Sequence, residues 1–169
     1  MRTGEVLTHA TAVTAFVFYV AGVALRWVGS LAWSRWCWTL GCLVLVIHVG
    51  CAFEFVHHWS HQAALEATAR QTAELTGINS GGGLWLNYLL VVIWLADVAY
   101  SWMARQSYES RAKWVEWAVQ GFLGFMWFNA TVVFGHGPSR WLGLAAMGLL
   151  VVVGWRRRSR FGVPPIPAD

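Results

Sequence analysis

Long apolar segments alternate with short polar ones along this chain. The apolar segments cover approximately residues 7–27, 34–58, 84–104, 115–134 and 140–156. Because a helix of about 20 mostly apolar residues crosses the hydrocarbon core of a bilayer, each segment predicts a transmembrane helix. The pattern therefore predicts an all-α integral membrane protein, a five-transmembrane-helix bundle that forms a single domain over residues 1–160.

The last apolar segment is the shortest. Its roughly 15 residues would span only ~22 Å as a helix, less than a bilayer core of about 30 Å. Snorkelling of Arg140 and Arg156 would make up the difference. The proline-containing tail that follows, residues 161–169, is expected to be disordered.

Residues 59–76 are polar and contain neither proline nor glycine. Glu66, Arg70 and Glu74 follow one another at the i, i+4 spacing that stabilises a solvated helix. We therefore expect the second transmembrane helix to continue beyond the outer face as a helical extension. Gly77 is expected to end it, since glycine is a common helix terminator.

Charge sets the orientation. The chain is 57% hydrophobic and 12% charged, with a net charge of +4, whereas a soluble domain carries about 25% charged residues. With the C-terminus inside, nine of the twelve lysines and arginines fall on the inner side. The positive-inside rule then predicts an N-out/C-in topology, and we expect the bacterial cytoplasmic (inner) membrane. The basic residues lie at segment edges, so the lipid bilayer is the expected partner and nucleic acid is not.

This orientation gathers most histidines at the outer, periplasmic-side face. Counting ~1.5 Å per residue from the inner end of each span brings one set of side chains to a similar height. The set contains His9, Glu54, His57, His58, His61 and His136. On a continuous helix, three of them, Glu54, His58 and His61, would share one stripe.

Imidazoles beside a carboxylate suit iron, copper or zinc, and a histidine can also ligate haem b. Pairs at i, i+3 or i, i+4 can hold one metal, but a single helix cannot surround it. His9 and His136 are therefore the candidates to complete the shell. The leading hypothesis is a metal or haem site that serves redox chemistry, metal handling or a metal-dependent membrane reaction. No catalytic residue stands out, and whether the protein is an enzyme stays open.

Three other interpretations compete with that site. The histidines can simply be solvated side chains at the point where the second helix leaves the membrane, with no ligand role. The alanine-rich residues 59–76 can dock a membrane-complex partner or a second copy, which would make the chain a non-catalytic accessory or assembly subunit. His48 and Asp97 can form a proton or ion path, although Asp97 can equally pair with Arg105.

The run His57-His58-x-x-His61 resembles the histidine boxes of membrane desaturases and hydroxylases over five residues. Those enzymes carry several boxes with the paired histidines last. This chain has one box in the opposite order, and we do not assign it to that family.

Overall fold

The computed structural model describes residues 3–135 and 137–161, and all regular structure in these ranges is helical. The elements are α1 (Thr3–Trp27), α2 (Leu31–Phe55), α3 (His61–Thr76), α4 (Gly83–Met103), α5 (Arg105–Glu109), α6 (Lys113–Phe128), the π-helix η1 (Asn129–Val133) and α7 (Pro138–Phe161).

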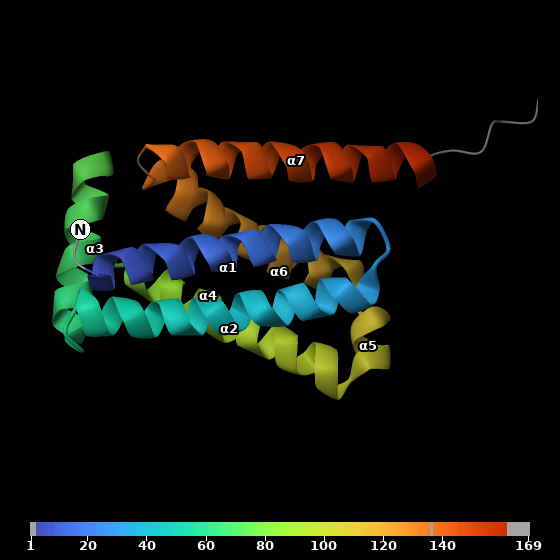
Figure 1. Cartoon of the computed structure of the whole chain (residues 1–169), viewed down its shortest axis with the longest axis horizontal. Helices are drawn as coiled ribbons and strands as arrows, with labels where there is room; N and C mark the ends of the chain where they lie inside the picture. The colour runs from blue at the N-terminus through green and yellow to red at the C-terminus, as the bar shows by residue number, and fades with distance from the viewer. Residues whose placement is uncertain (1–2, 136, 162–169) are drawn as a thin grey trace, which may run out of the picture.

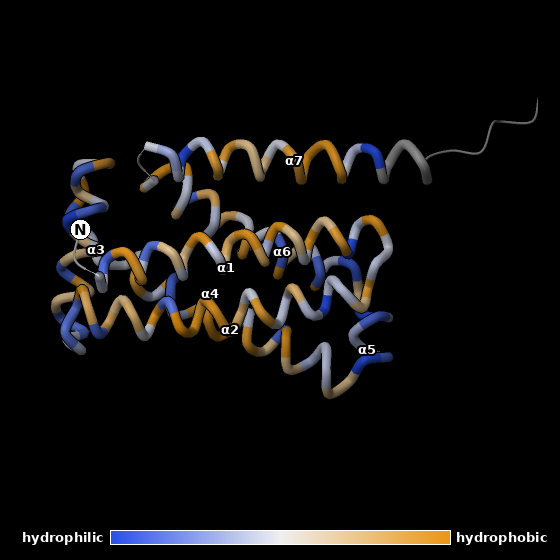
Figure 2. Tube along the Cα trace, in the orientation of Figure 1, coloured by the Kyte–Doolittle hydropathy of each residue, from blue (hydrophilic) through white to orange (hydrophobic). Residues whose placement is uncertain are grey.

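Among the described residues, α1, α2, α4 and α7 are long and apolar enough to cross a membrane. Figure 1 shows α1, α2 and α7 running along one common direction, with α3 across one end of the bundle and α5 at the other. Figure 2 shows apolar residues along the long helices and polar residues concentrated in α3 and α5. Many large apolar side chains, such as Leu43, Ile47 and Val92, face outward. An outward apolar surface between two polar ends is the surface of an integral membrane protein.

Exposed tryptophans mark both ends of the bundle. Toward the α5 end lie Trp33, Trp36, Trp102, Trp114, Trp117 and Trp155, and toward the α3 end lie Trp59, Trp85 and Trp141. Tryptophan is enriched at both membrane–water interfaces, so these two groups fit the interfacial belts of an embedded bundle.

The expected continuation of the second helix into residues 59–76 is wrong. Helix α2 ends at Phe55, and α3 starts as a separate helix at His61. Between them His58 and Trp59 have φ angles of 49° and 56°, in the left-handed region that no α-helix continues through. The Ser60 side chain then accepts a hydrogen bond from the Ala63 N–H at 3.1 Å, an N-cap that starts a new helix.

Helix α3 therefore lies across the end of the bundle instead of projecting into water along the α2 axis (Figure 1). It packs against α4, with Ala64 buried at 1% exposure. Its end is as predicted, because Gly77 caps it in the left-handed conformation at φ 75°.

The last helix is longer than the sequence predicted. Helix α7 has 24 residues and runs through Phe161, so Phe161, placed in the expected disordered tail, is helical. The helix begins at Pro138, whose fixed φ suits the first helical position. The rest of that tail, residues 162–169, lies outside the described residues.

An interlocked aromatic core joins four helices. Tyr19 of α1, Trp38 of α2, Trp94 of α4 and Trp127 of α6 are each at most 5% exposed. The ring centroids of Trp38 and Trp94 lie 5.2 Å apart, and those of Tyr19 and Trp127 lie 6.1 Å apart. Gly41 permits this packing, because a Cβ there would lie 2.9 Å from the Trp94 ring. Aromatic pairs in this range add to the stability gained from their burial, so this cluster holds the bundle together at mid-height.

Candidate functional site

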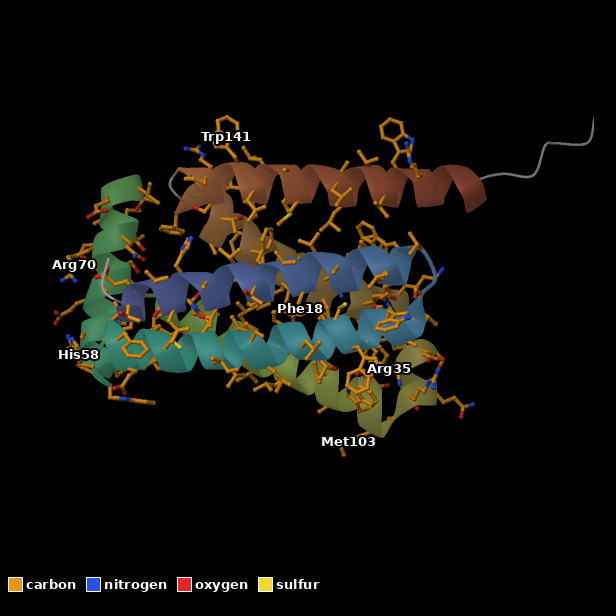
Figure 3. All side chains as sticks on the ribbon, in the orientation of Figure 1. Phe18, Arg35, His58, Arg70, Met103 and Trp141 are labelled. Atoms are coloured by element: carbon orange, nitrogen blue, oxygen red, sulfur yellow. The ribbon has the colours of Figure 1, made fainter. Side chains whose placement is uncertain are left out.

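The histidines and Glu54 that the sequence assigned to a metal site lie near the α3 end, but they do different things. Glu54 is exposed on the last turn of α2, and its carboxylate accepts a hydrogen bond from Trp59 Nε1 at 2.6 Å. His57 is half-buried, with its ring 5.8 Å from that of Phe53. His58 is exposed in the turn itself, near the same end as Arg70 of α3 (Figure 3). The break after α2 has removed the common stripe expected of these side chains.

His61 faces helix α4. Its Nδ1 lies 3.0 Å from the Tyr88 hydroxyl, and the two rings stack with centroids 5.9 Å apart. The ring of Trp85 contacts it edge-on at 5.7 Å. These contacts attach the first turn of α3 to α4, which gives His61 a structural role at this corner.

His9 is exposed on α1, and His136 lies outside the described residues. Within residues 3–135 and 137–161, no group of three histidine, cysteine, aspartate or glutamate side chains is arranged to hold a metal ion. The described geometry therefore does not support the histidine cluster. The metal or haem site stays a prediction, and the geometry of the described residues does not support it.

His48 ties α1 to α2. Its Nδ1 lies 2.9 Å from the Thr8 carbonyl oxygen and 3.4 Å from the Thr11 hydroxyl. Asp97 is not among its hydrogen-bond partners. The aromatic core fills the bundle interior at mid-height, so the geometry offers no support for a polar path that joins His48 to Asp97.

The most organised polar site lies at the opposite, α5 end, around Asp97. Trp38 Nε1 and the Tyr108 hydroxyl donate to Asp97 Oδ2 at 2.9 and 2.8 Å. The Arg111 guanidinium forms an ion pair with Oδ1, and both side chains of this pair are 4% exposed. The expected partner of Asp97, Arg105, is wrong: Arg105 instead bonds Glu109, four residues ahead, at 2.9 Å.

The local fold explains this exchange of partners. Helix α4 ends at Met103, and the short α5 turns the chain back. The turn brings Tyr108 and Arg111 onto Asp97 of α4, while the side chain of Arg105 faces solvent and is 63% exposed. Trp38 lies in the second predicted segment, 34–58, and nothing in its spacing indicates that its indole N–H reaches a buried carboxylate.

Two further ion pairs surround Asp97. Arg26 of α1 binds Glu116 of α6 at 2.6 Å, and Arg35 of α2 binds Glu109 of α5 at 3.2 Å. Figure 3 shows Arg35 at the α5 end. The hydrogen bond from Arg105 holds the pKa of Glu109 below its ordinary value. Together with the contacts of Asp97, these pairs connect α1, α2, α4, α5 and α6, so one polar network holds the α5 turn against the bundle.

Tyr108 lies at the centre of this network. The guanidinium carbons of Arg111 and Arg26 lie 4.1 and 5.5 Å from its ring centroid, within the range of cation–π attraction. Burial raises the pKa of the Tyr108 hydroxyl, and the nearby Asp97 carboxylate raises it further. Tyr108 therefore stays protonated and acts as a hydrogen-bond donor.

Comparison with protein-family models, curated proteins and solved structures finds no match for this chain. The class that the fold defines is an all-helical membrane protein.

Proposed function

We propose that the chain crosses the membrane five times, with its N-terminus outside and its C-terminus in the cytoplasm of a bacterial cell. Helix α6 continues into η1, so one helical segment returns from the α5 end to the α3 end (Figure 1). That segment is the fifth span beside α1, α2, α4 and α7. The α5 end carries the basic residues Arg26, Arg35, Arg105, Arg111, Lys113 and Arg156. The positive-inside rule makes that end cytoplasmic.

Cysteine accessibility tests this topology. The native cysteines, Cys37, Cys42 and Cys51, are first replaced by alanine. A membrane-impermeant maleimide should then label Ser80→Cys and Arg140→Cys in intact cells, and Gln106→Cys only after lysis. Protection of Ser80→Cys together with labelling of Gln106→Cys in intact cells would reverse the orientation. Labelling of Gln106→Cys and Arg140→Cys from the same side would remove the fifth span.

We further propose that the protein is a non-catalytic accessory or assembly subunit that presents α3 to a partner protein at the outer face. The observation that carries this proposal is the placement of α3. One face of this 16-residue helix packs on α4, with Ala64 buried and His61 against Tyr88, and its other face is exposed. The exposed face carries Gln62, Glu66, Arg70 and Glu74.

Two features make this role more suitable than transport. Packed aromatic rings of Tyr19, Trp38, Trp94 and Trp127 occupy the middle of the bundle, where a transport path would need polar side chains. Asp97, the charge that could serve transport, is engaged by Arg111 and two hydrogen bonds. A rigid bundle with a helix held across one end is suited to display a surface.

Site-specific photocrosslinking tests the assembly role. A photoreactive residue at Glu66 or Arg70 should give one discrete protein adduct, and the same residue at Gln106 should not. The double charge reversal Glu66→Lys/Arg70→Glu should abolish the adduct while membrane insertion stays normal. The untreated protein should also migrate in a native gel above the mass of a single chain, 18.9 kDa.

Metal analysis and an absorption spectrum of the purified protein test the alternative, a metal or haem site. A stoichiometric metal or a Soret band that is lost in Glu54→Gln and His58→Ala would overturn the non-catalytic role and establish the metal or haem site. Absence of any discrete α3 adduct, with a single-chain native mass, would also contradict an assembly subunit.

A further inference from the structure

A small pocket opens at the α5 end of the bundle, beside the Asp97 network. Its walls come from α1, α2, α4, α5 and α6, and its lining includes Arg26, Leu31, Arg35, Tyr108, Glu109 and Gln120. The enclosed space is about 20 Å³, enough for one water or one ligand oxygen. A larger group would therefore insert one polar atom and lie across the mouth.

The charges around this pocket do not balance. Four arginines, Arg26, Arg35, Arg105 and Arg111, meet three carboxylates, Asp97, Glu109 and Glu116. Glu109 is shared, because both Arg35 and Arg105 bond its Oε1 atom. Arg35 lines the pocket and is only 14% exposed. The Arg35 guanidinium is therefore partly buried and shares its only carboxylate partner with Arg105. Such a group favours the approach of an anion.

Buried polar atoms without partners lie in or beside the pocket. The described residues contain five buried side-chain atoms without a hydrogen-bond partner. Three of them, Gln120 Oε1 and Arg111 Nε and Nη2, lie here, and the other two are the indole nitrogens of Trp94 and Trp127 in the aromatic core. Gln120 is a wall residue, and Arg111 stacks on the ring of Tyr108, another wall residue. Unpaired buried polar groups are rare, and a bound water or ion is one of the arrangements that satisfy them. The glutamine oxygen requires a donor, and the arginine nitrogens require an acceptor.

We propose that this pocket binds a phosphate ester that also carries hydroxyl groups. The phosphate oxygens neutralise the excess arginine charge near Arg35, and a hydroxyl donates to Gln120 Oε1. Arginine suits this role because its planar fork matches a phosphate group. The chemistry is shared by a glycerol-bearing lipid headgroup and by soluble glycerol or sugar phosphates.

The surroundings of the pocket suit a lipid source. Exposed Trp33, Trp36 and Trp102 lie at the same end, where interfacial tryptophans meet the lipid headgroups. Basic pockets between helices on the cytoplasmic side commonly receive anionic headgroups. This inference rests on membrane insertion, and not on the assembly role of α3.

The test uses the full chain in an uncharged detergent. Phosphatidylglycerol should raise the unfolding temperature and stay bound in native mass spectrometry, and phosphatidylcholine should do neither. Glycerol 3-phosphate forms a third arm. Binding of glycerol 3-phosphate as tight as that of phosphatidylglycerol would support the pocket and assign it to a soluble ligand.

Variants connect the binding to the pocket. Arg35→Gln should weaken phosphatidylglycerol binding about tenfold, the loss expected for one charge-assisted hydrogen bond. Leu31→Trp should block the mouth without changing any charge and abolish binding. Arg70→Gln, which removes an arginine at the opposite end, is the matched control and should bind normally.

Equal binding of the two lipids by the native protein, with no binding of glycerol 3-phosphate, would overturn the proposal. So would unchanged lipid binding in both Arg35→Gln and Leu31→Trp. If Arg35→Gln fails to fold, Leu31→Trp decides alone. Loss of α3 crosslinks with normal lipid binding would contradict the assembly role and leave this inference intact.

Discussion

At the scale of single residues, the Asp97–Arg111 ion pair lies inside the protein, with both side chains 4% exposed. Asp97→Asn keeps an oxygen for Trp38 and Tyr108 but leaves the Arg111 charge buried and unpaired. Removing one partner of a buried pair costs about 3–5 kcal/mol. We expect a loss of that size in the free energy of unfolding, measured by denaturant titration in mixed micelles with circular dichroism.

A double variant separates charge from packing. Asp97→Asn/Arg111→Met removes both charges and keeps an acceptor oxygen for Trp38 and Tyr108, so it should recover most of the stability that Asp97→Asn alone loses. An ordinary surface change alters the free energy of unfolding by about 0.5 kcal/mol. If Asp97→Asn differs from the native protein by no more than that, the Asp97–Arg111 pair is not the key contact that holds the α5 turn.

His57 gives the α2–α3 turn a defined pH response. Partial burial of the ring, and secondly the neighbouring His58, hold the pKa of His57 below its ordinary 6.5. The unfolded chain then binds a proton more readily than the folded one, so stability falls as pH drops below about 6.5. We expect His57→Gln to flatten the dependence of the unfolding temperature on pH between about 7.5 and 5.

The control for this response is Glu109→Gln. The lowered pKa of Glu109 contributes stability that is lost only as pH falls below its ordinary 4.5 and through the folded value. Glu109→Gln should therefore leave the slope between pH 7.5 and 5 unchanged. A slope in His57→Gln as steep as in the native protein would mean that other histidines cause it.

At the scale of elements, the turn between α2 and α3 predicts the sign of the stability change caused by substitutions at His58. His58 has a φ of 49°, a conformation that glycine adopts without steric cost. His58→Gly should therefore leave stability unchanged or raise it by up to about 1 kcal/mol, whereas His58→Val should lower it. Denaturant unfolding of the three proteins measures the order.

The same pair of variants distinguishes the turn from a continuous helix. If residues 56–60 were helical, glycine at position 58 would cost roughly 0.5–1 kcal/mol, and valine would be the milder change. A His58→Gly variant less stable than His58→Val would therefore contradict the break after Phe55.

The four long apolar helices of the described residues were predictable because their signal is long and one-dimensional. Apolar runs of about 20 residues need no knowledge of tertiary contacts, and the predicted segments at 7–27 and 84–104 match α1 and α4 to within a few residues. The turn at His58 was not predictable from periodicity, because no glycine or proline marks it. Ser60 was its only local signal, and serine also occurs inside helices.

The candidate site was less predictable than the fold. The prediction that the histidines lie at one height and face assumed a straight second helix. The turn at His58 and Trp59, both left-handed, ends that helix and points these side chains in different directions. The Asp97 network depends on Trp38, Tyr108 and Arg111, which are between 11 and 59 residues away from it in sequence. No helical spacing connects such positions, and only the reversal of the chain at α5 brings them together.

At the scale of the whole molecule, α7 stands out from the rest of the bundle. Only 11% of its apolar window is buried, the lowest value among the candidate spans in the described residues. It touches the bundle through α1, through η1 and lightly through α6. Gly143 lies against η1, where an added Cβ would come within 2.4 Å of the Thr131 hydroxyl oxygen. Gly154 approaches Trp27 in the same way, at 3.2 Å.

The two mid-helix glycines Gly143 and Gly148 form a matched pair that tests this docking. A Cβ at Gly148 meets nothing within 4 Å, so Gly148→Ala should gain about 0.5–1 kcal/mol from helix propensity alone. Gly143→Ala carries the same propensity gain but pushes α7 away from Thr131, and we expect a net loss of stability of about 1–3 kcal/mol. Denaturant unfolding measures both.

Because α7 is peripheral, the Gly143→Ala loss should appear as an early partial transition, with the Tyr19–Trp38–Trp94–Trp127 core unfolding later at its native midpoint. Equal gains in the two variants would show that α7 is not seated on η1, and a single shifted transition in Gly143→Ala would show that α7 unfolds together with the core.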